Sequence, residues 1–359
     1  MPPLKNTLVW QVFAALVPLG LTAIWLFLRV QAARIVLAAF LALSVIVILA
    51  YCRIFSGNGV DQKEMNVNTQ ALALFILVYA ILFALFSKDL IGILGVWILV
   101  IGLFVIFLIV IGVCIAGRAM GLLIDSRNRI SLSTFQTILW TVILLSAFFT
   151  VAAALMQTEG QLDYAFNIAL DQRLWVLMGI SVTTLAGTPL VKDVKSGRKV
   201  SIRALRDYTM RNAERILERI RKQPTRFPSD KYPNVSKAED LVSLPDYLLR
   251  AAVEDDHDGP LYIAPDQKEA TAMDIFRADE LVNYYRVDLA KVQMFFFTVV
   301  GALAYMLILA DWITTLKLGA VTAENLAAFP VMHEGFVAIL GISHAGFLGN
   351  TAVTQTPAG

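Results

Sequence analysis

Long runs without a charged side chain constrain this 359-residue chain more than any other feature of its sequence. A helix of roughly 20 apolar residues can cross the ~30 Å hydrocarbon core of a bilayer. Eight runs of at least 18 residues reach that length: 6–28, 35–52, 65–87, 90–117, 130–158, 174–191, 292–310 and 335–359. Hydrophobic residues make up 58% of the chain and charged residues 16%, which argues against a water-soluble enzyme. The sequence therefore predicts an all-α, polytopic membrane protein with eight transmembrane helices.

The charged residues are concentrated in one segment. Between Lys192 and Arg286 lie 35 of the 58 charged residues, so we expect a small helical domain in water between the sixth and seventh helices. Loops on the N-terminal side of the membrane carry more Lys and Arg than loops on the other side. The positive-inside rule then places this domain and both termini in the cytoplasm.

A two-helix unit occurs twice along the chain. Residues 131–148 align with 288–305 at a constant offset of 157, and residues 177–191 align with 339–353 at an offset of 162. An even number of predicted crossings separates the copies, so both units point the same way, as in parallel-repeat transporters. The predicted parts are a four-helix transmembrane region (1–117), a first repeat pair (118–191), a cytoplasmic helical domain (192–287) and a second repeat pair with a C-terminal tail (288–359).

Each repeat opens on a residue that favours a helix start, Ser131 or Asp288, two residues after Arg129 or Arg286. A side-chain oxygen at that position accepts hydrogen bonds from the free N–H groups of the first helical turn. We expect both helices to begin there, at the cytoplasmic interface.

Within the inserted domain, residues 192–237 carry a net charge of +9 and residues 238–287 a net charge of −8. The simplest interpretation is a small helical domain that is complementary to itself or to a neighbouring subunit. A basic face beside an anionic leaflet is the competing interpretation. Nucleic-acid binding is disfavoured because the whole domain is nearly neutral.

The spacing of apolar residues predicts the helices of this domain. One amphipathic helix is expected over about 201–222, and helices are expected to resume near 238–254 and 271–285. A turn is expected at Gly259–Pro260.

Small residues lie four apart along both Gly-Ile-Ser segments. The two stripes, which we interpret as helix-packing residues, are Gly179, Thr183, Gly187 and Gly341, Ala345, Gly349. Residues of this size let two helix backbones approach closely.

Polar residues near these stripes are candidates to line a pore or a polar seam: Gln136, Gln293, Ser181, Ser343, His344 and Asn350. Amides and hydroxyls between membrane helices usually act as glue worth about 0.6–2 kcal/mol each. His344 is the one ionisable side chain in the core of a predicted span, which makes it a functional candidate, although a lone histidine is more often a neutral, hydrogen-bonded packing residue.

No catalytic chemistry is indicated. The chain has no phosphate-cradling loop, dinucleotide fingerprint or zinc-binding helix pair. The acidic run 254–259 lacks the alternating ligand spacing of a calcium loop, and Cys52 and Cys114 have no metal-site spacing. We therefore expect no enzyme activity, no metal and no cofactor. Proton pumps and voltage sensors are disfavoured because the spans hold almost no ionisable groups.

The repeated segments resemble a group of uncharacterised bacterial polytopic membrane proteins, in which Ser-Leu-Ser-x-x-Gln precedes Gly-Ile-Ser-x-x-x-x-Leu-Gly. The first copy carries these motifs at 131–142 and 179–187, with Ala186 and Pro189 departing from the pattern, and the second copy matches from 273 to 346. The resemblance implies a multi-pass protein of the bacterial inner membrane and supplies no activity.

Two functions fit these observations. The first, slightly favoured, is a homo-oligomeric channel or transporter for ions or small solutes, regulated by the cytoplasmic domain. The second is a non-enzymatic membrane anchor or signalling and assembly platform that binds a cytoplasmic protein partner. The partners expected are the lipid bilayer, further copies of the chain and a cytoplasmic protein, with no nucleic acid. Convergence of Gln136, Gln293, Ser343 and His344 on a hydrated cavity would favour the first function, and burial in dry helix contacts the second.

Overall fold

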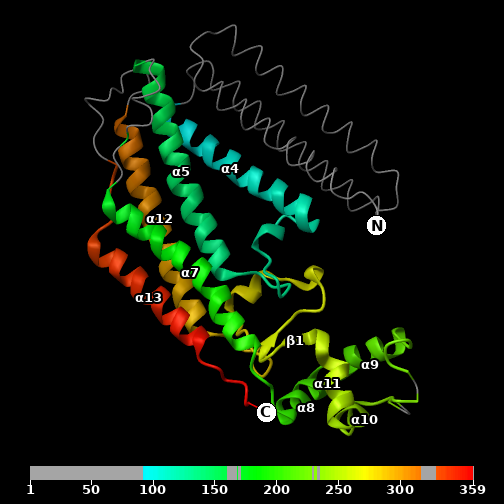
Figure 1. Cartoon of the computed structure of the whole chain (residues 1–359). Coiled ribbons are helices and arrows are strands. Elements are labelled where there is room, and N and C mark those ends of the chain that lie inside the picture. Colours follow the sequence, from blue (N-terminus) through cyan, green and yellow to red (C-terminus); the bar gives the residue numbers. More distant parts are fainter. Residues whose placement is uncertain are drawn as a thin grey trace, which may run out of the picture. The chain divides into compact units, whose positions relative to one another are not determined.

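The computed structural model describes residues 92–159, 168, 171–228, 230–232, 235–316 and 329–358. Within these residues, five helices are long and apolar enough to cross a membrane: α4 (Ile93–Ala116), α5 (Leu132–Glu159), α7 (Gln172–Ser196), α12 (Leu289–Thr315) and α13 (Glu334–Ala352) (Figure 1). They correspond to the last five predicted runs. The runs 6–28, 35–52 and 65–87 lie outside the described residues. The chain is mostly helical and its long apolar helices are those of a membrane protein.

The chain divides into two compact units. The described part of the first unit contains α4, residues 138–159 of α5, the first turns of α7 and the later part of α12. The second unit comprises Leu123–Thr137, Gly179–Val299 and Gly335–Gly359. It therefore contains α13 apart from its first residue, the first turns of α5 and α12, most of α7 and all of the segment between α7 and α12.

Aromatic side chains pack the helices of the first unit. The rings of Trp140 on α5 and Tyr305 on α12 lie 6.2 Å apart and are fully buried. The Tyr305 hydroxyl donates to the carbonyl of Pro330 at 2.9 Å, and the indole N–H of Trp97 on α4 donates to Ser146 on α5 at 3.0 Å. The rings fill the apolar space between helices, and the Tyr305 hydroxyl and the Trp97 indole N–H both have hydrogen-bond acceptors there.

Helices α7 and α13 lie side by side in the second unit and run parallel (Figure 1). Contacts between them advance together along both helices, from Ile180 with Gly341, through Thr184 with His344, to Gly187 with Leu348. Helices α5 and α12 also run parallel, because Gln136 contacts Thr298 and Trp140 contacts Tyr305. Parallel pairs are what two repeats inserted in the same sense would form, while the repeat itself stays a prediction.

The predicted helix starts are confirmed. Helix α5 begins one residue after Ser131, whose Oγ accepts from the N–H of Thr134 at 3.3 Å. Helix α12 begins one residue after Asp288, whose Oδ1 accepts from the N–H of Ala290 at 2.9 Å. Each start follows a loop closed by a single β-bridge: Ile124 with Ile130, and Arg277 with Val287.

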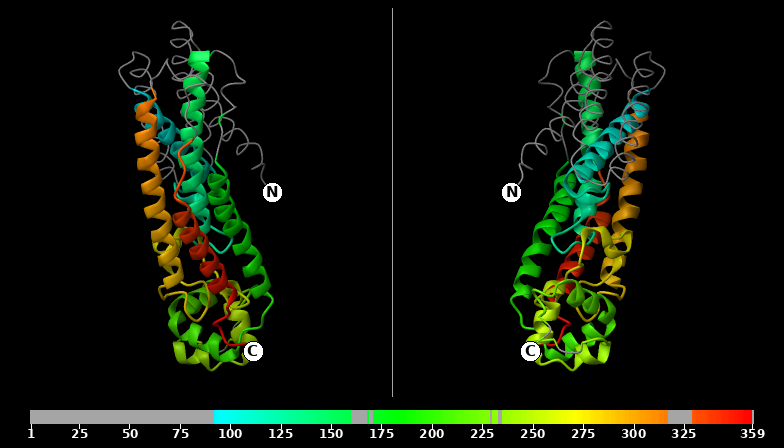
Figure 2. Two further views of the ribbon diagram at one scale, coloured as in Figure 1. Left: turned by 90° about the vertical axis from the view of Figure 1, so that its left-hand side faces the viewer. Right: turned by 90° about the vertical axis from the view of Figure 1, so that its right-hand side faces the viewer.

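The segment between α7 and α12 forms a helical domain, defined here as residues 197–287 (Figure 2). Its helices are α8 (Ile202–Arg211), α9 (Ala213–Lys222), α10 (Ala238–Val242) and α11 (Asp246–Val253). After α11 come a short 3-10 turn at Glu254–Asp256 and a β-hairpin, in which β1 (His257–Asp258) is antiparallel to β2 (Leu261–Tyr262). Two further 3-10 turns follow, at Gln267–Glu269 and Ala272–Phe276. Apolar faces of the four helices meet in one core that includes Leu205, Tyr208, Ile216, Leu241, Leu249 and Val253.

The predicted turn at Gly259–Pro260 is confirmed, since it joins β1 to β2. Gly259 has φ +53°, and a Cβ atom there would lie 2.3 Å from the carbonyl oxygen of Ser196 at the end of α7. Only glycine fits both the left-handed backbone and this close approach.

Three helix predictions in the domain need correction. The helix expected over 201–222 is interrupted at Asn212, whose Nδ2 donates to the Tyr208 carbonyl at 2.9 Å and to the Tyr284 hydroxyl at 3.0 Å. The helix expected over 238–254 is interrupted before α11 by Pro245, which has no N–H to continue it. The helix expected over 271–285 is wrong beyond Phe276. There the backbone pairs with the hairpin instead, as in the 2.9 Å bond from the N–H of Tyr262 to the Asp279 carbonyl.

The two oppositely charged halves of the domain pair with each other within one chain. Arg206 on α8 bonds to Asp246 on α11 at 3.0 Å. Arg215 and Arg219 on α9 both pair with Asp256, which is fully buried. The self-complementary interpretation of the charge pattern is therefore the one that the structure contains.

Candidate functional site

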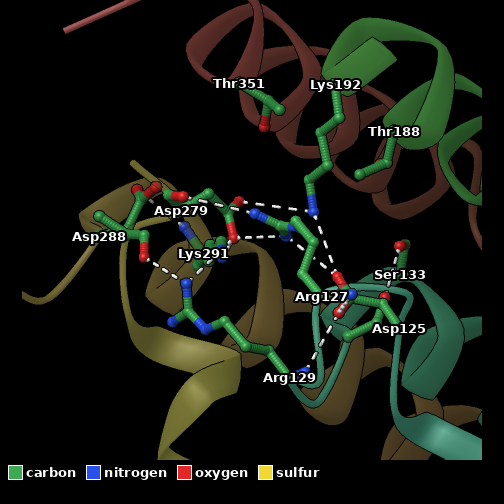
Figure 3. Close-up of polar contacts among 12 residues, drawn as sticks. Asp125, Arg127, Arg129, Ser133, Thr188, Lys192, Asp279, Asp288, Lys291 and Thr351 are labelled. Carbon is green, nitrogen blue, oxygen red and sulfur yellow. Dashed lines mark hydrogen bonds and ion pairs between the residues drawn. The ribbon is translucent and has the colours of Figure 1, made fainter. Parts of the chain in front are cut away.

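A buried group of charged side chains joins the helical domain to the ends of the long helices (Figure 3). We call it the charge cluster, and its members are Asp125, Arg127, Arg129, Lys192, Asp279 and Lys291. They come from the loop before α5, the last turns of α7, the segment before α12 and the first turn of α12. All six lie within the second unit.

Asp279 is at the centre of the charge cluster. Its Oδ1 lies 2.9 Å from Arg127 Nη2 and 3.0 Å from Lys291 Nζ. Arg129 Nη1 lies 3.5 Å from the same oxygen, and Lys192 Nζ lies 3.7 Å from Oδ2. One carboxylate therefore contacts four basic side chains, which come from the loop before α5, from α7 and from α12.

Asp125 organises the loop that carries two of these cations. Its Oδ1 accepts from the backbone N–H groups of Arg127 at 3.0 Å and Arg129 at 3.2 Å. Its Oδ2 pairs with Arg127 Nη2 at 3.0 Å and lies 3.7 Å from Lys192 Nζ. Asn128 has φ +59°, a conformation that asparagine tolerates, and its side chain donates to the Ala264 carbonyl at 2.8 Å. Asp125 thus fixes the conformation of the loop, and Asn128 ties the loop to the helical domain.

The electrostatics of the carboxylates follow from their neighbours. Burial alone would raise the pKa of Asp279, but the four cations around it hold that pKa well below its usual value. Burial also opposes ionisation of Asp125, whose pKa is nevertheless lowered, first by Arg127 and then by Lys192. Both carboxylates are therefore ionised at neutral pH.

The charge cluster holds more positive than negative charge. Four basic side chains face only two carboxylates. Asp274 does not remove this excess, because it lies 4.0 Å from Arg129 Nε and also pairs with Arg277 at 3.4 Å. Arg129 Nη2 is buried and has no hydrogen-bond partner among the described residues. Burying cations is costly, so the cluster depends on each of its carboxylates.

A second buried pair holds the C-terminal tail beside the charge cluster. Lys195 Nζ donates to Glu280 Oε1 at 2.7 Å and to the Val353 carbonyl at 2.7 Å. Glu280 Oε2 accepts from the backbone N–H groups of Gln355 at 2.8 Å and Thr356 at 2.6 Å, and from the Thr356 hydroxyl at 2.8 Å. The tail after α13 is thereby fixed to the helical domain and to α7.

Three of the polar residues singled out from the sequence take part in hydrogen bonds to a neighbouring helix. Gln136 is fully buried, and its Nε2 donates to Thr298 Oγ1 at 2.5 Å. His344 Nδ1 shares a 2.6 Å hydrogen bond with the Thr184 hydroxyl, so this histidine is a hydrogen-bonded packing residue. Ser181 is buried on α7, and its carbonyl accepts from Thr137 on α5.

The remaining polar candidates are not brought together with them. Gln293 is exposed, unlike Gln136, with which it aligns in the sequence. Ser343 is buried with no hydrogen-bond partner for its hydroxyl among the described residues. Asn350 donates to Asp288, the capping residue of α12, at 3.1 Å.

The small-residue stripes form few close contacts. A Cβ atom at Gly179 or Gly349 would meet nothing within 4 Å, whereas one at Gly187 would lie 3.5 Å from Leu348 and one at Gly341 would lie 3.6 Å from Ile180. Thr183 and Ala345 are exposed. Only the parts of the stripes that face the neighbouring helix are packed within the described chain.

The charge cluster was not identified from the sequence. Its basic residues flank the predicted spans, where Lys and Arg are read as signals of topology. A usable signal was present in Asp125, Arg127 and Arg129, which alternate in a short loop, and in Lys291, which lies within the first turn of α12. Their shared partner, Asp279, is separated from the loop by about 150 residues of sequence, so spacing alone does not reveal it.

Comparison with protein-family models finds no match to this chain, and comparisons with curated proteins and with solved structures find none either. Among the described residues, no group of three or more His, Cys, Asp or Glu side chains is arranged to hold a metal ion.

The Gln136–Thr298 bond offers a test of the interhelical polar contacts. We expect Gln136→Leu and Thr298→Val each to lower the free energy of unfolding by about 0.6–2 kcal/mol. The double variant should lose less than the sum, because the two side chains share one bond. A double-mutant cycle in detergent, followed by denaturant unfolding, measures the coupling. Strict additivity would show that the bond contributes nothing.

Proposed function

We propose that this protein is a non-enzymatic membrane platform whose helical domain binds partner proteins and transmits their binding to the membrane helices. In this proposal the chain is a multi-pass protein of the bacterial inner membrane, and the helical domain and both termini lie in the cytoplasm. The observation that carries the proposal is the charge cluster, which ties the domain to the ends of α5, α7 and α12.

The geometry of the charge cluster supports mechanical coupling. Asp279 belongs to the helical domain, whereas Lys192 and Lys291 belong to α7 and α12. A displacement of the domain would separate a buried carboxylate from several buried cations at once, which is energetically costly. The domain and the helix ends are therefore expected to move together.

The polar side chains between the helices support the platform over a pore within one chain. Gln136 and His344 are buried and hydrogen-bonded to neighbouring helices, and Gln293 lies on a different, exposed surface. These residues do not converge on one path.

Permeation by an oligomer is the second candidate function, and a specific observation favours it. Gln293 on α12 and Thr183 on α7 are polar, yet both are exposed on helices long enough to span a membrane. Polar side chains in a membrane favour contact with other helices or with water. A homo-oligomer would supply such contacts.

Reconstitution separates the two functions. The full chain in liposomes should conduct neither ions nor small solutes at either sign of membrane potential if it is a platform. Flux that depends on the protein and disappears in Gln293→Leu would overturn the platform proposal in favour of an oligomeric pore.

The partner surface needs a test that leaves the charge cluster intact. Deleting residues 200–285 removes Asp279 and Glu280, so loss of partner binding in that deletion would be uninformative. Met210 on α8 and Tyr247 on α11 are better targets, because they are 51% and 70% exposed and lie on two helices joined by an ion pair.

We expect the double variant Met210→Ser/Tyr247→Ser to fold in the membrane and to lose a partner that co-purifies with the intact protein. Met273→Ser, which changes another exposed apolar residue of the domain, serves as the matched control and should retain it. A partner retained equally by both variants would place its binding outside α8 and α11. Absence of any partner of the intact protein would reject the platform.

A further inference from the structure

A cavity of about 300 Å³ opens where the end of α7 meets the C-terminal tail. Its walls are Arg198 and Lys199 just after α7, Pro260 of the hairpin turn, and Thr354–Ala358 of the tail. All three wall segments belong to the second unit.

The walls are held in place by buried contacts. Gly259 packs against the backbone of Ser196, which fixes the hairpin turn on the end of α7. Glu280 accepts three hydrogen bonds from Gln355 and Thr356, which fixes the tail. The tail also pairs with the chain after α7, where the N–H of Ser201 donates to the Pro357 carbonyl at 3.0 Å. The cavity is therefore part of the folded structure.

The polar groups of the cavity favour an anion. Two of its lining residues, Arg198 and Lys199, are cations, and no carboxylate occurs among the described residues that line it. Arg198 Nη1 donates to the Thr354 hydroxyl at 2.7 Å, which orients the guanidinium and leaves its other N–H groups for a ligand. Guanidinium and ammonium groups together match a phosphate, through directed hydrogen bonds and a point charge respectively.

The position of the cavity indicates where the phosphate comes from. Arg198 follows the last residue of α7 by two positions, and Thr354 follows the last residue of α13 by two positions. Both helices are long and apolar enough to span a membrane, so the cavity lies close to where they leave the lipid. Basic pockets between helix ends at that depth bind anionic lipid headgroups.

We propose that the cavity formed by Arg198, Lys199 and the C-terminal tail binds the phosphate of an anionic lipid headgroup. The site depends on α7 and α13 spanning the membrane, and it is independent of any partner protein on α8 and α11. The bound lipid would fasten the helical domain to the membrane surface beside the charge cluster.

The test uses the full chain in neutral detergent, with phosphatidylglycerol, phosphatidylcholine and inorganic phosphate added separately. Phosphatidylglycerol should remain bound in native mass spectra and raise the unfolding temperature, whereas phosphatidylcholine should do neither. Inorganic phosphate at the same concentration should have no effect, because it lacks acyl chains that bury against the helices. An equal effect of inorganic phosphate would overturn the lipid assignment in favour of a free anion.

Two double variants that each lose two positive charges test whether the lipid binds in this cavity. Arg198→Gln/Lys199→Gln should weaken phosphatidylglycerol binding by about 25-fold, since each cation near a membrane surface contributes roughly fivefold. Arg203→Gln/Arg221→Gln removes two exposed cations of α8 and α9 and should bind like the unaltered protein. If phosphatidylglycerol binding weakened equally in both variants, the lipid would be attracted by the overall positive charge of the protein and not by this cavity, and the proposal would be wrong. Lys199→Gln alone, at an exposed position, should weaken binding by about fivefold even if the double variant folds poorly.

Discussion

Asp279→Asn is expected to lower the free energy of unfolding by about 3–5 kcal/mol, because it leaves buried cations without their shared carboxylate. The neutral amide keeps the size of the side chain and removes the charge that contacts Arg127, Lys291, Arg129 and Lys192. Its NH2 group would also point at least one donor toward cations that need acceptors. The loss should appear as a large fall in unfolding temperature in detergent.

The matched control is Asp207→Asn, the same change at an exposed position on α8. It should alter stability by no more than about 0.5 kcal/mol. A loss of stability in Asp279→Asn no larger than in this control would show that the charge cluster does not hold the helical domain to the helix ends.

The dependence of unfolding free energy on pH provides a second measurement of the effect of Asp279→Asn. The pKa of Asp279 is well below its usual value in the folded protein, so its contribution to stability is fully present above the unfolded pKa of about 3.9. That contribution is lost as the pH falls from there through the folded pKa. Asp279→Asn should therefore flatten the fall of stability below about pH 4, compared with the unaltered protein.

The sequence predicted correctly those parts of the fold that depend on interactions between residues close together in the chain. Runs without charge predicted the five described spans, because the length and apolarity of a helix are properties of one segment. Ser131 and Asp288 predicted helix starts, because a capping bond closes within the first turn. Gly259 predicted a turn, because glycine allows the left-handed backbone that a tight turn requires.

Long-range contacts determined the parts that sequence reasoning missed. Asn212 interrupts a continuous amphipathic pattern because its side chain bonds to Tyr284, 72 residues away. Residues after Phe276 do not continue a helix, because Asp279 and Glu280 bind cations from other segments and their backbone pairs with the hairpin. These partners lie far from Asn212 and from residues 277–285 in the sequence, so the local pattern of apolar residues does not reveal them.

The difference between Gln136 and Gln293 has the same origin. The two residues are equivalent in the aligned segments, yet one is buried and the other exposed. The amide of Gln136 faces Thr298 on the neighbouring helix, whereas Gln293 lies on the outer side of that same helix. The packing of α5 on α12 therefore decides which of the two aligned residues becomes buried.

Glu280→Gln is expected to release the C-terminal tail while the core of α8–α11 stays folded. The carboxylate accepts from Lys195, from the N–H groups of Gln355 and Thr356, and from the Thr356 hydroxyl. A hydrogen bond to a charged group contributes about 1–1.5 kcal/mol more than one to a neutral group, so weakening two of them lowers the opening free energy of the tail by about 2–3 kcal/mol. Amide hydrogen exchange at Gln355 and Thr356 should then be about 30- to 150-fold faster.

The double variant Lys195→Met/Glu280→Gln tests whether the buried pair acts as a unit. Glu280→Gln alone leaves Lys195 buried with only the Val353 carbonyl as a partner, whereas the double variant removes that unpaired charge. It should therefore recover much of the global stability lost in the single variant, while exchange in the tail stays fast, because the tail amides still lack a charged acceptor. Glu269→Gln, at an exposed position, should change neither measurement. Recovery of slow exchange in the double variant would mean that Lys195, and not the Glu280 carboxylate, controls the tail and with it one wall of the proposed lipid site.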